Sequence, residues 1–92
     1  MEKRENINVR VRFYAELKDL LKVKAVNLEL TSGSDWGSLV EALSKRLSND
    51  VMHHLRRKGL LIAVNNILVR ELNKLELKDG DVIDIMPLPS GG

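Results

Sequence analysis

The sequence predicts an α+β domain in which one main helix packs across a mixed sheet of about five strands. Two observations support this prediction. Two short segments in the first third of the chain alternate apolar and polar residues, and one longer stretch after them repeats its apolar residues at helical spacing. With 92 residues, of which 43% are hydrophobic, the chain is long enough for one small core and too short for two.

The chain begins with two predicted strands. Residues 7–13 alternate apolar with polar side chains, which is the period-two pattern of a strand with one buried face. Residues 26–30 alternate in the same way. We expect these strands to form a hairpin joined through the short segment 15–22, and residues 1–6 to be a flexible N-terminus.

The main helix is predicted to follow Asp35, an N-cap candidate at the end of a turn-forming Thr-Ser-Gly-Ser-Asp sequence. Apolar residues then recur at helical spacing, and polar residues take the other side. A second, shorter helical segment is expected over 51–57, before Gly59 ends it. The apolar face of the main helix comprises Trp36, Leu39, Val40, Leu43 and Leu47.

Three further strands are predicted in the C-terminal half. An apolar run at 60–65 ends in Asn65-Asn66, which is typical of a tight turn, and a short strand follows at 67–69. A Lys-Asp-Gly-Asp turn at 78–81, with glycine where a positive φ is easy, leads into the last strand at 82–86.

One helix that follows a hairpin and packs on a mixed sheet is the β-grasp arrangement. We therefore expect a β-grasp domain over residues 7–86. The remaining residues, 87–92, are expected to form an extended C-terminal tail.

The composition excludes several functional classes. The chain contains no cysteine, which removes disulfides, a thiolate nucleophile and every cysteine-based metal site. No apolar run approaches the roughly 20 residues of a membrane span, and residues 1–10 lack the apolar centre of a secretory signal. We expect a cytoplasmic protein with no membrane partner.

The charge balance does not favour nucleic-acid binding. Fifteen Lys and Arg stand against thirteen Asp and Glu, so the net charge is only +2. The densest basic group, Arg56-Arg57-Lys58, has no aromatic residue nearby, whereas single-strand binders combine basic grooves with stacking rings. We expect a solvated surface at this group and no nucleic-acid partner.

The usual catalytic and metal-binding patterns are missing. His53 and His54 are adjacent, and neighbouring residues on a helix point about 100° apart, so the two cannot bind one metal on a single face. Gly33, Gly59 and Gly80 are isolated and match no phosphate-binding loop. We expect no metal site, no cofactor bound by this chain and no catalytic residues of its own.

The C-terminal tail is the most informative functional feature. Its two prolines prevent helix and central-strand continuation and keep the residues before them extended. Six extended residues span roughly 20 Å, enough to thread a terminus into the active site of another protein. Two glycines at the tip let a narrow channel close around the backbone while the terminal carboxylate reaches a reagent. The tail consists of Pro87, Leu88, Pro89, Ser90, Gly91 and Gly92.

Strand parity predicts a second functional feature. If Ile67 and Val69 face the core, Leu68 points to the other side of the sheet, and Tyr14 and Met86 are out of phase in the same way. We expect Tyr14, Leu68 and Met86 to form an apolar patch that a partner binds. Because Met86 adjoins the tail, a partner bound there would aim the chain terminus.

Three segments of the chain share their order and spacing with a known family. They are Val11-Arg12-Phe13-Tyr14-Ala15, Leu61-Ile62-Ala63-Val64-Asn65, and Leu77-Lys78-Asp79-Gly80-Asp81-Val82-Ile83 leading to Pro87 and Ser90-Gly91-Gly92. In these segments the chain resembles the ubiquitin-like sulfur-carrier superfamily, and most closely the small subunits of molybdopterin synthase. The resemblance covers nearly the whole chain from Ile7.

The resemblance implies a β-grasp fold and chemistry at Gly92. A ubiquitin-activating-type adenylyltransferase would adenylate this residue with ATP and Mg²⁺, and sulfur would replace AMP to give a thiocarboxylate. The large subunit of molybdopterin synthase would then take the sulfur. In the family, the counterparts of Tyr14, Leu68 and Met86 contact these partners, and Gly91 keeps the entry to the active site narrow.

The downstream acceptor is open at this stage. The family often has consecutive prolines before its Gly-Gly, where this chain has Pro87-Leu88-Pro89, and related carriers use the same tail for thiamine synthesis, for tRNA thiolation or for attachment to target-protein lysines, as in small archaeal-type modifiers. A different class also fits, namely a noncatalytic binding module that uses the sheet face while the tail is incidental.

Overall fold

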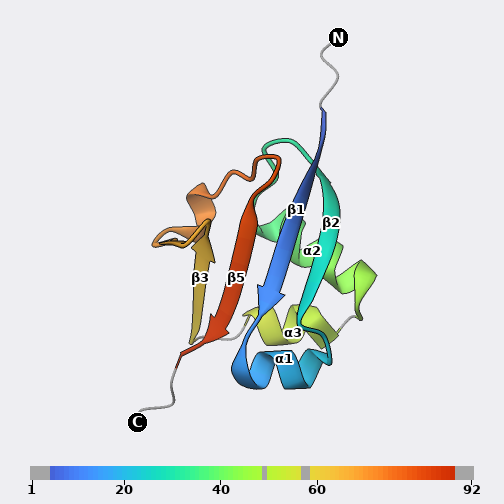
Figure 1. The fold of residues 1–92 in the computed structure, drawn as a ribbon, viewed down its shortest axis with the longest axis vertical. Coiled ribbons are helices and arrows are strands. Elements are labelled where there is room, and N and C mark those ends of the chain that lie inside the picture. The colour runs from blue at the N-terminus through green and yellow to red at the C-terminus, as the bar shows by residue number, and fades with distance from the viewer. Residues whose placement is uncertain (1–4, 49, 57–58, 89–92) are drawn as a thin grey trace.

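The computed structural model describes residues 5–48, 50–56 and 59–88, and its strands and helices alternate along the chain (Figure 1). The strands are β1 (Asn6–Phe13), β2 (Ala25–Thr31), β3 (Leu60–Val64), β4 (Ile67–Leu68) and β5 (Val82–Pro87). The helices are α1 (Ala15–Leu21), α2 (Trp36–Arg46) and α3 (Asp50–Arg56), with a 3₁₀ turn at Leu72–Lys74.

The described strands form one mixed sheet with the order β2-β1-β5-β3-β4. β1 pairs with β2 in antiparallel and with β5 in parallel orientation, and β3 pairs antiparallel with both β5 and β4. The first and last strands of the chain therefore lie side by side at the centre of the sheet. This arrangement confirms the predicted α+β class and the β-grasp fold.

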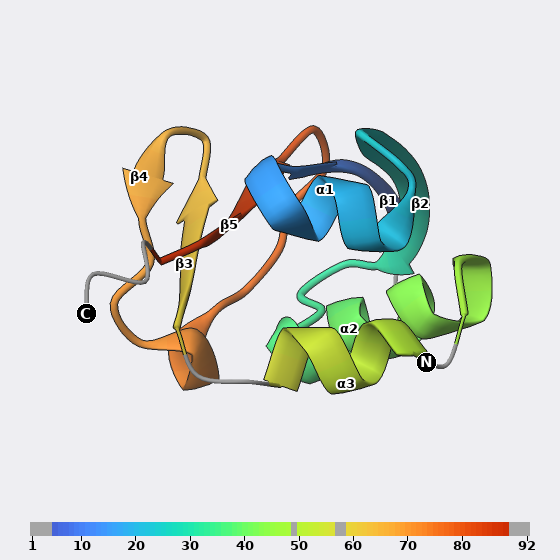
Figure 2. The ribbon, with the colours of Figure 1, turned by 90° about the horizontal axis from the view of Figure 1, so that it is seen from below.

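The main helix begins and packs as its sequence predicts. The Asp35 Oδ1 atom accepts a hydrogen bond of 2.9 Å from the Ser38 N–H, which satisfies one of the free donors at the start of α2. Leu39, Val40 and Leu43 are buried against the sheet, and burial of each such side chain contributes roughly 1.5–3 kcal/mol of transfer free energy. Figure 2 shows α2 and α3 together on one side of the sheet.

The connection between β1 and β2 differs from the expected short hairpin link. The two strands do pair as a hairpin, but residues 15–21 between them form α1. Leu17 is fully buried, and Lys22 ends the helix with a left-handed conformation while its N–H donates to the Lys18 carbonyl. This tertiary burial stabilises a helix too short to form in isolation.

The first and last strands extend one residue beyond each end of the predicted domain, residues 7–86. Asn6, assigned to the flexible N-terminus, pairs with Thr31 in the sheet, and the Glu5 carbonyl accepts a hydrogen bond of 2.8 Å from the Ser32 N–H. At the other end, Pro87 belongs to β5, because a proline at the end of a strand loses no ladder hydrogen bond that the strand needs. Residues 1–4 of the predicted N-terminal segment lie outside the described part.

The two predicted turns position β5 against its neighbours. Asn65 and Asn66 both have positive φ, as a tight hairpin turn requires. The Asn65 side chain donates to Asp81 Oδ1 at 2.9 Å and accepts from the Val82 N–H at 2.9 Å. Gly80 has a φ of +85°, where a side chain would be strained, and its N–H donates to the Asn8 carbonyl.

Candidate functional site

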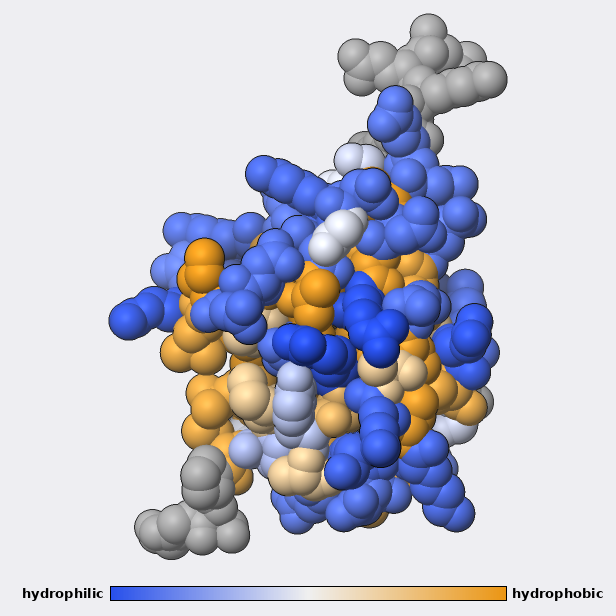
Figure 3. All heavy atoms as spheres, in the orientation of Figure 1, coloured by the Kyte–Doolittle hydropathy of each residue, from blue (hydrophilic) through white to orange (hydrophobic). Residues whose placement is uncertain are grey.

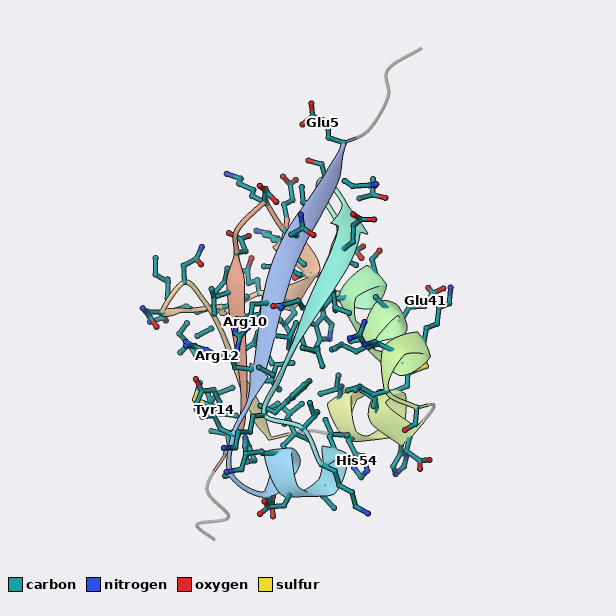
Figure 4. All side chains as sticks on the ribbon, turned by 45° about the vertical axis from the view of Figure 1, so that its right-hand side comes forward. Glu5, Arg10, Arg12, Tyr14, Glu41 and His54 are labelled. Carbon is teal, nitrogen blue, oxygen red and sulfur yellow. The ribbon has the colours of Figure 1, made fainter. Side chains whose placement is uncertain are left out.

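The face of the sheet turned away from α2 and α3 is the candidate functional site, and we call it the open face. Figure 3 looks onto it: hydrophobic residues gather on the side of β3 and β4, and hydrophilic residues dominate the centre and the α1 end. Figure 4 shows Arg10, Arg12 and Tyr14 on this side, whereas Glu41 and His54 lie on the helix side. The sheet thus separates a core face from a face that is available to a partner.

Strand register arranges the open face in rows. Val11 and Phe13 lie opposite Ile83 and Ile85 on the core side, so the residues between and after them lie on the open side. In one row Arg12 lies opposite Asp84, which lies opposite Ala63, which lies opposite Leu68. In the next row Tyr14 follows the end of β1, and Met86 lies opposite Leu61. The three residues selected by parity, Tyr14, Leu68 and Met86, therefore share one face.

The centre of the open face is occupied by an ion pair. Arg12 binds Asp84 with both arms of its guanidinium, Nε to Oδ1 at 2.6 Å and Nη2 to Oδ2 at 2.9 Å. The Tyr14 hydroxyl donates a third hydrogen bond to Asp84 Oδ1 at 3.0 Å. The Asp84 side chain is 8% exposed and that of Arg12 40%. Such a paired and largely buried carboxylate fixes the position of the side chains around it.

This network shifts the pKa values of its members. The hydrogen bonds from Arg12 hold the pKa of the Asp84 carboxyl below its ordinary value, although burial opposes that shift. The pKa of Tyr14 is raised, mainly by burial and also by its hydrogen bond to Asp84. The same carboxylate raises the pKa of Arg12. At neutral pH the face therefore presents an ionised pair and a neutral phenol.

Ile67 has the orientation that parity predicts, but it is not buried. Its exposed fraction is 72%, more than the 49% of Leu68. Its register partner Val64 lies on the core side, so Ile67 has the predicted orientation. β4, however, is a two-residue edge strand beyond the described helices, and nothing described covers its core side (Figure 2). Val69 packs against the core as expected.

Sequence reasoning missed three residues of the open face. Leu61 and Ala63 lie between Met86 and Leu68, and they complete an apolar surface over β3, β4 and β5. Asp84 was missed although it is the one charged residue in the last strand. The signals were present: β3 is apolar at every position, as expected of a strand with two covered faces, and a carboxylate interrupts β5.

The start of the tail is fixed at one end of the open face. Pro87 pairs with Leu60, and the Leu88 N–H donates to the Gly59 carbonyl at 2.6 Å. Leu88 is 46% exposed. The predicted tail residues Pro89, Ser90, Gly91 and Gly92 lie outside the described residues.

The remaining candidate groups can be placed as well. His53 and His54 meet edge to face with ring centroids 5.9 Å apart on α3. Within residues 5–48, 50–56 and 59–88, no three His, Asp or Glu side chains gather as metal ligands do. The helices in these ranges are also too short and polar to cross a bilayer. Of the basic group at 56–58, residues 57 and 58 are outside the described part.

Comparison with known proteins supports a specific family. The model of the ThiS family matches residues 11–92. No curated protein matched the sequence in a direct comparison.

Several solved structures have the same fold. A putative molybdopterin converting factor, subunit 1, from Pyrococcus furiosus is 28% identical, with a TM-score of 0.68 over 89% of this chain and 98% of that one. One chain of the protein-protein complex of subunits 1 and 2 of the molybdopterin-converting factor from Helicobacter pylori is 27% identical. Its TM-score is 0.58 over 94% of this chain and 100% of that one. The small archaeal modifier protein 1 from Methanosarcina acetivorans is 23% identical, with a TM-score of 0.69 over 96% and 99%.

Proposed function

The chain belongs to the ThiS family of ubiquitin-like sulfur carriers, and from this premise we propose that it carries sulfur on Gly92 for molybdopterin synthesis. In the proposed reaction the Gly92 carboxylate attacks the α-phosphorus of ATP, forming an acyl adenylate and releasing pyrophosphate. Hydrosulfide then attacks the acyl carbon, AMP leaves, and a thiocarboxylate remains. The adenylating enzyme supplies ATP and Mg²⁺, so this chain is a substrate.

The observation that carries the proposal is that the tail starts at one end of the open face. β5 lies next to β1 and presents Met86 beside Tyr14, and the strand ends one residue later, at Pro87. Four residues beyond Leu88 reach at most about 13–14 Å. A partner that binds the open face therefore has Gly92 within reach of its own active centre.

The choice of molybdopterin synthesis as the pathway rests on two structural relatives. The Pyrococcus furiosus and Helicobacter pylori proteins are named for the molybdopterin converting factor, and the second is described as a complex of subunits 1 and 2. By analogy we propose a large subunit as the second partner of the open face. It would accept the sulfur of the Gly92 thiocarboxylate.

The test is mass spectrometry of the intact protein after incubation with its adenylyltransferase, Mg-ATP and sodium sulfide. We expect the mass increase that replacement of one oxygen by sulfur gives, mapped to the C-terminal peptide. Omitting ATP is the control and should leave the mass unchanged. An unchanged mass in the complete reaction would contradict the proposal.

Variants at the tip separate this chemistry from simple binding. Gly92→Ala places a methyl group where the proposed channel has space for none, so we expect slower adenylation. Deletion of residues 91–92 should abolish it while the circular dichroism spectrum stays native. A binding module that uses only the sheet face would tolerate both changes.

A second candidate function is protein modification through the same tail. The likeness to the archaeal modifier protein from Methanosarcina acetivorans favours it. In that case the adenylated Gly92 is attacked by a lysine ε-amine, AMP leaves, and an isopeptide bond forms. Tagged protein recovered from cells would then yield branched peptides in which a target lysine carries the C-terminal peptide of this chain, and their absence would count against this function.

A further inference from the structure

A basic hollow adjoins the patch of Tyr14, Leu68 and Met86, at the point where β1 leads into α1. Its volume is about 370 Å³, and Tyr14 lines both the hollow and the patch. Among the described residues, its lining contains no carboxylate. The charged lining consists of Arg10, Arg12, Lys18 and Lys24.

Most of this positive charge is not neutralised. Arg12 is paired with Asp84. Arg10, in contrast, donates from Nη1 to the neutral amide oxygen of Asn27 at 3.3 Å. Neither Lys18 nor Lys24 forms an ion pair with another residue in the described ranges. Three cations therefore face one opening.

The basic surface continues around the corner. A neighbouring hollow of about 320 Å³ between α1 and β2 is lined by Lys18, Lys22 and Lys24, with Asp19 as the one acidic residue of its described lining. Like charges that line one hollow repel each other, and a partner that supplies negative charge relieves the repulsion. The whole α1 corner thus carries excess positive charge beside an apolar surface.

We infer that the basic hollow binds carboxylate side chains of the enzyme that docks on the open face. The inference rests on the proposed function and names the chemistry of its partner. An apolar side chain of the enzyme packs against Tyr14 and Met86, and acidic residues beside it face Lys18 and Lys24. Charges that lie within about 8 Å of a partner's charges, the Debye length at physiological salt, steer association and select partners.

The shape of the hollow favours a protein surface over a single compact anion. Its cations lie on β1, on α1 and directly before β2, and they line the same hollow as Tyr14. Several carboxylates spread over a partner surface match this spacing better than one phosphate does. The hollow is also continuous with the patch through Tyr14, so one partner covers both.

The experiment compares two charge-reversal pairs in binding to the adenylyltransferase. Lys18→Glu combined with Lys24→Glu reverses the hollow. Arg46→Glu combined with Lys78→Glu changes the net charge equally at exposed positions on α2 and in the turn before β5. Binding is measured by isothermal titration at low and high NaCl, and far-UV circular dichroism confirms that both variants fold.

We expect the hollow variant to bind about tenfold more weakly at low salt, the factor for two attractive charges made repulsive. The control should stay within about twofold of wild type, and the affinity of the hollow variant should depend less on salt. Equal affinities of the two variants would overturn the inference. So would displacement of the wild-type protein by inorganic phosphate at constant ionic strength, because the hollow would then be a phosphate site.

The outcome is distinguishable from failure of the proposed function. If wild type and hollow variant bind equally and both form the thiocarboxylate, only the inference fails. If wild type never forms a thiocarboxylate, the proposed function fails, and the inference falls with it.

Discussion

Asp84→Asn tests whether the ion pair at the centre of the open face stabilises the fold. Asp84 accepts three hydrogen bonds at 2.6, 2.9 and 3.0 Å and is almost fully buried. Breaking a fully buried pair costs about 3–5 kcal/mol. Because the Arg12 side chain is 40% exposed, water can solvate it in the variant, so we expect a loss of about 2 kcal/mol.

Urea unfolding followed by the fluorescence of the single Trp36 measures this loss. In a separate thermal scan, a loss of about 2 kcal/mol in a domain of this size should lower the melting temperature of Asp84→Asn by about 8–16 °C. Glu41→Gln is the matched control, since it removes one partner of the exposed pair with Lys45 on α2 and should cost about 0.3–0.5 kcal/mol. If Asp84→Asn costs no more than Glu41→Gln, the reasoning about burial is wrong.

Three further predictions follow from the same contacts. Because the folded pKa of Asp84 is lowered, its stabilising contribution is complete above the ordinary carboxyl pKa of about 4 and is lost as the pH falls through the folded value. The free energy of unfolding should therefore decrease less steeply with falling pH in Asp84→Asn than in wild type. Asp35, whose pKa is also lowered, should keep part of that pH dependence in the variant. Tyr14 is the single tyrosine, so the absorbance of its phenolate in a pH titration reports this residue alone. The titration midpoint should lie above the ordinary tyrosine pKa of about 10. In Asp84→Asn the midpoint should fall only part of the way back to that value, because burial raises the Tyr14 pKa more than the hydrogen bond to Asp84 does. Gly80→Ala should cost about 1 kcal/mol in urea unfolding, because φ at this position is +85° while the space around it is open; an unchanged midpoint would show that the turn adapts.

The sequence predicted those elements whose pattern is local and strong. β1 and β2 alternate over their length, and α2 combines helical spacing with an N-cap, so period and cap together sufficed. α1 escaped because its seven residues bury mainly Leu17 and depend on the sheet for stability. Local patterns contain little information about such tertiary stabilisation.

The candidate site was predictable only as far as parity reaches. Alternation assigns Tyr14, Leu68 and Met86 to one face without any knowledge of strand order. The pairing of Arg12 with Asp84 depends on β1 lying parallel to β5, two strands separated by most of the chain. No local pattern contains that register, so the central ion pair was found only in the structure.

The same ion pair links the open face to the start of the tail. Asp84 joins β5 to β1 through side chains, in addition to the backbone ladder, and Met86 and Pro87 follow within three residues. A strand bonded on both sides and cross-linked on its face holds Leu88 in a defined position. Since four residues extend at most about 13–14 Å, any enzyme that reacts with Gly92 must place its reactive centre within that distance of Leu88. An enzyme meets this requirement most simply by docking on the open face, which ends where the tail begins.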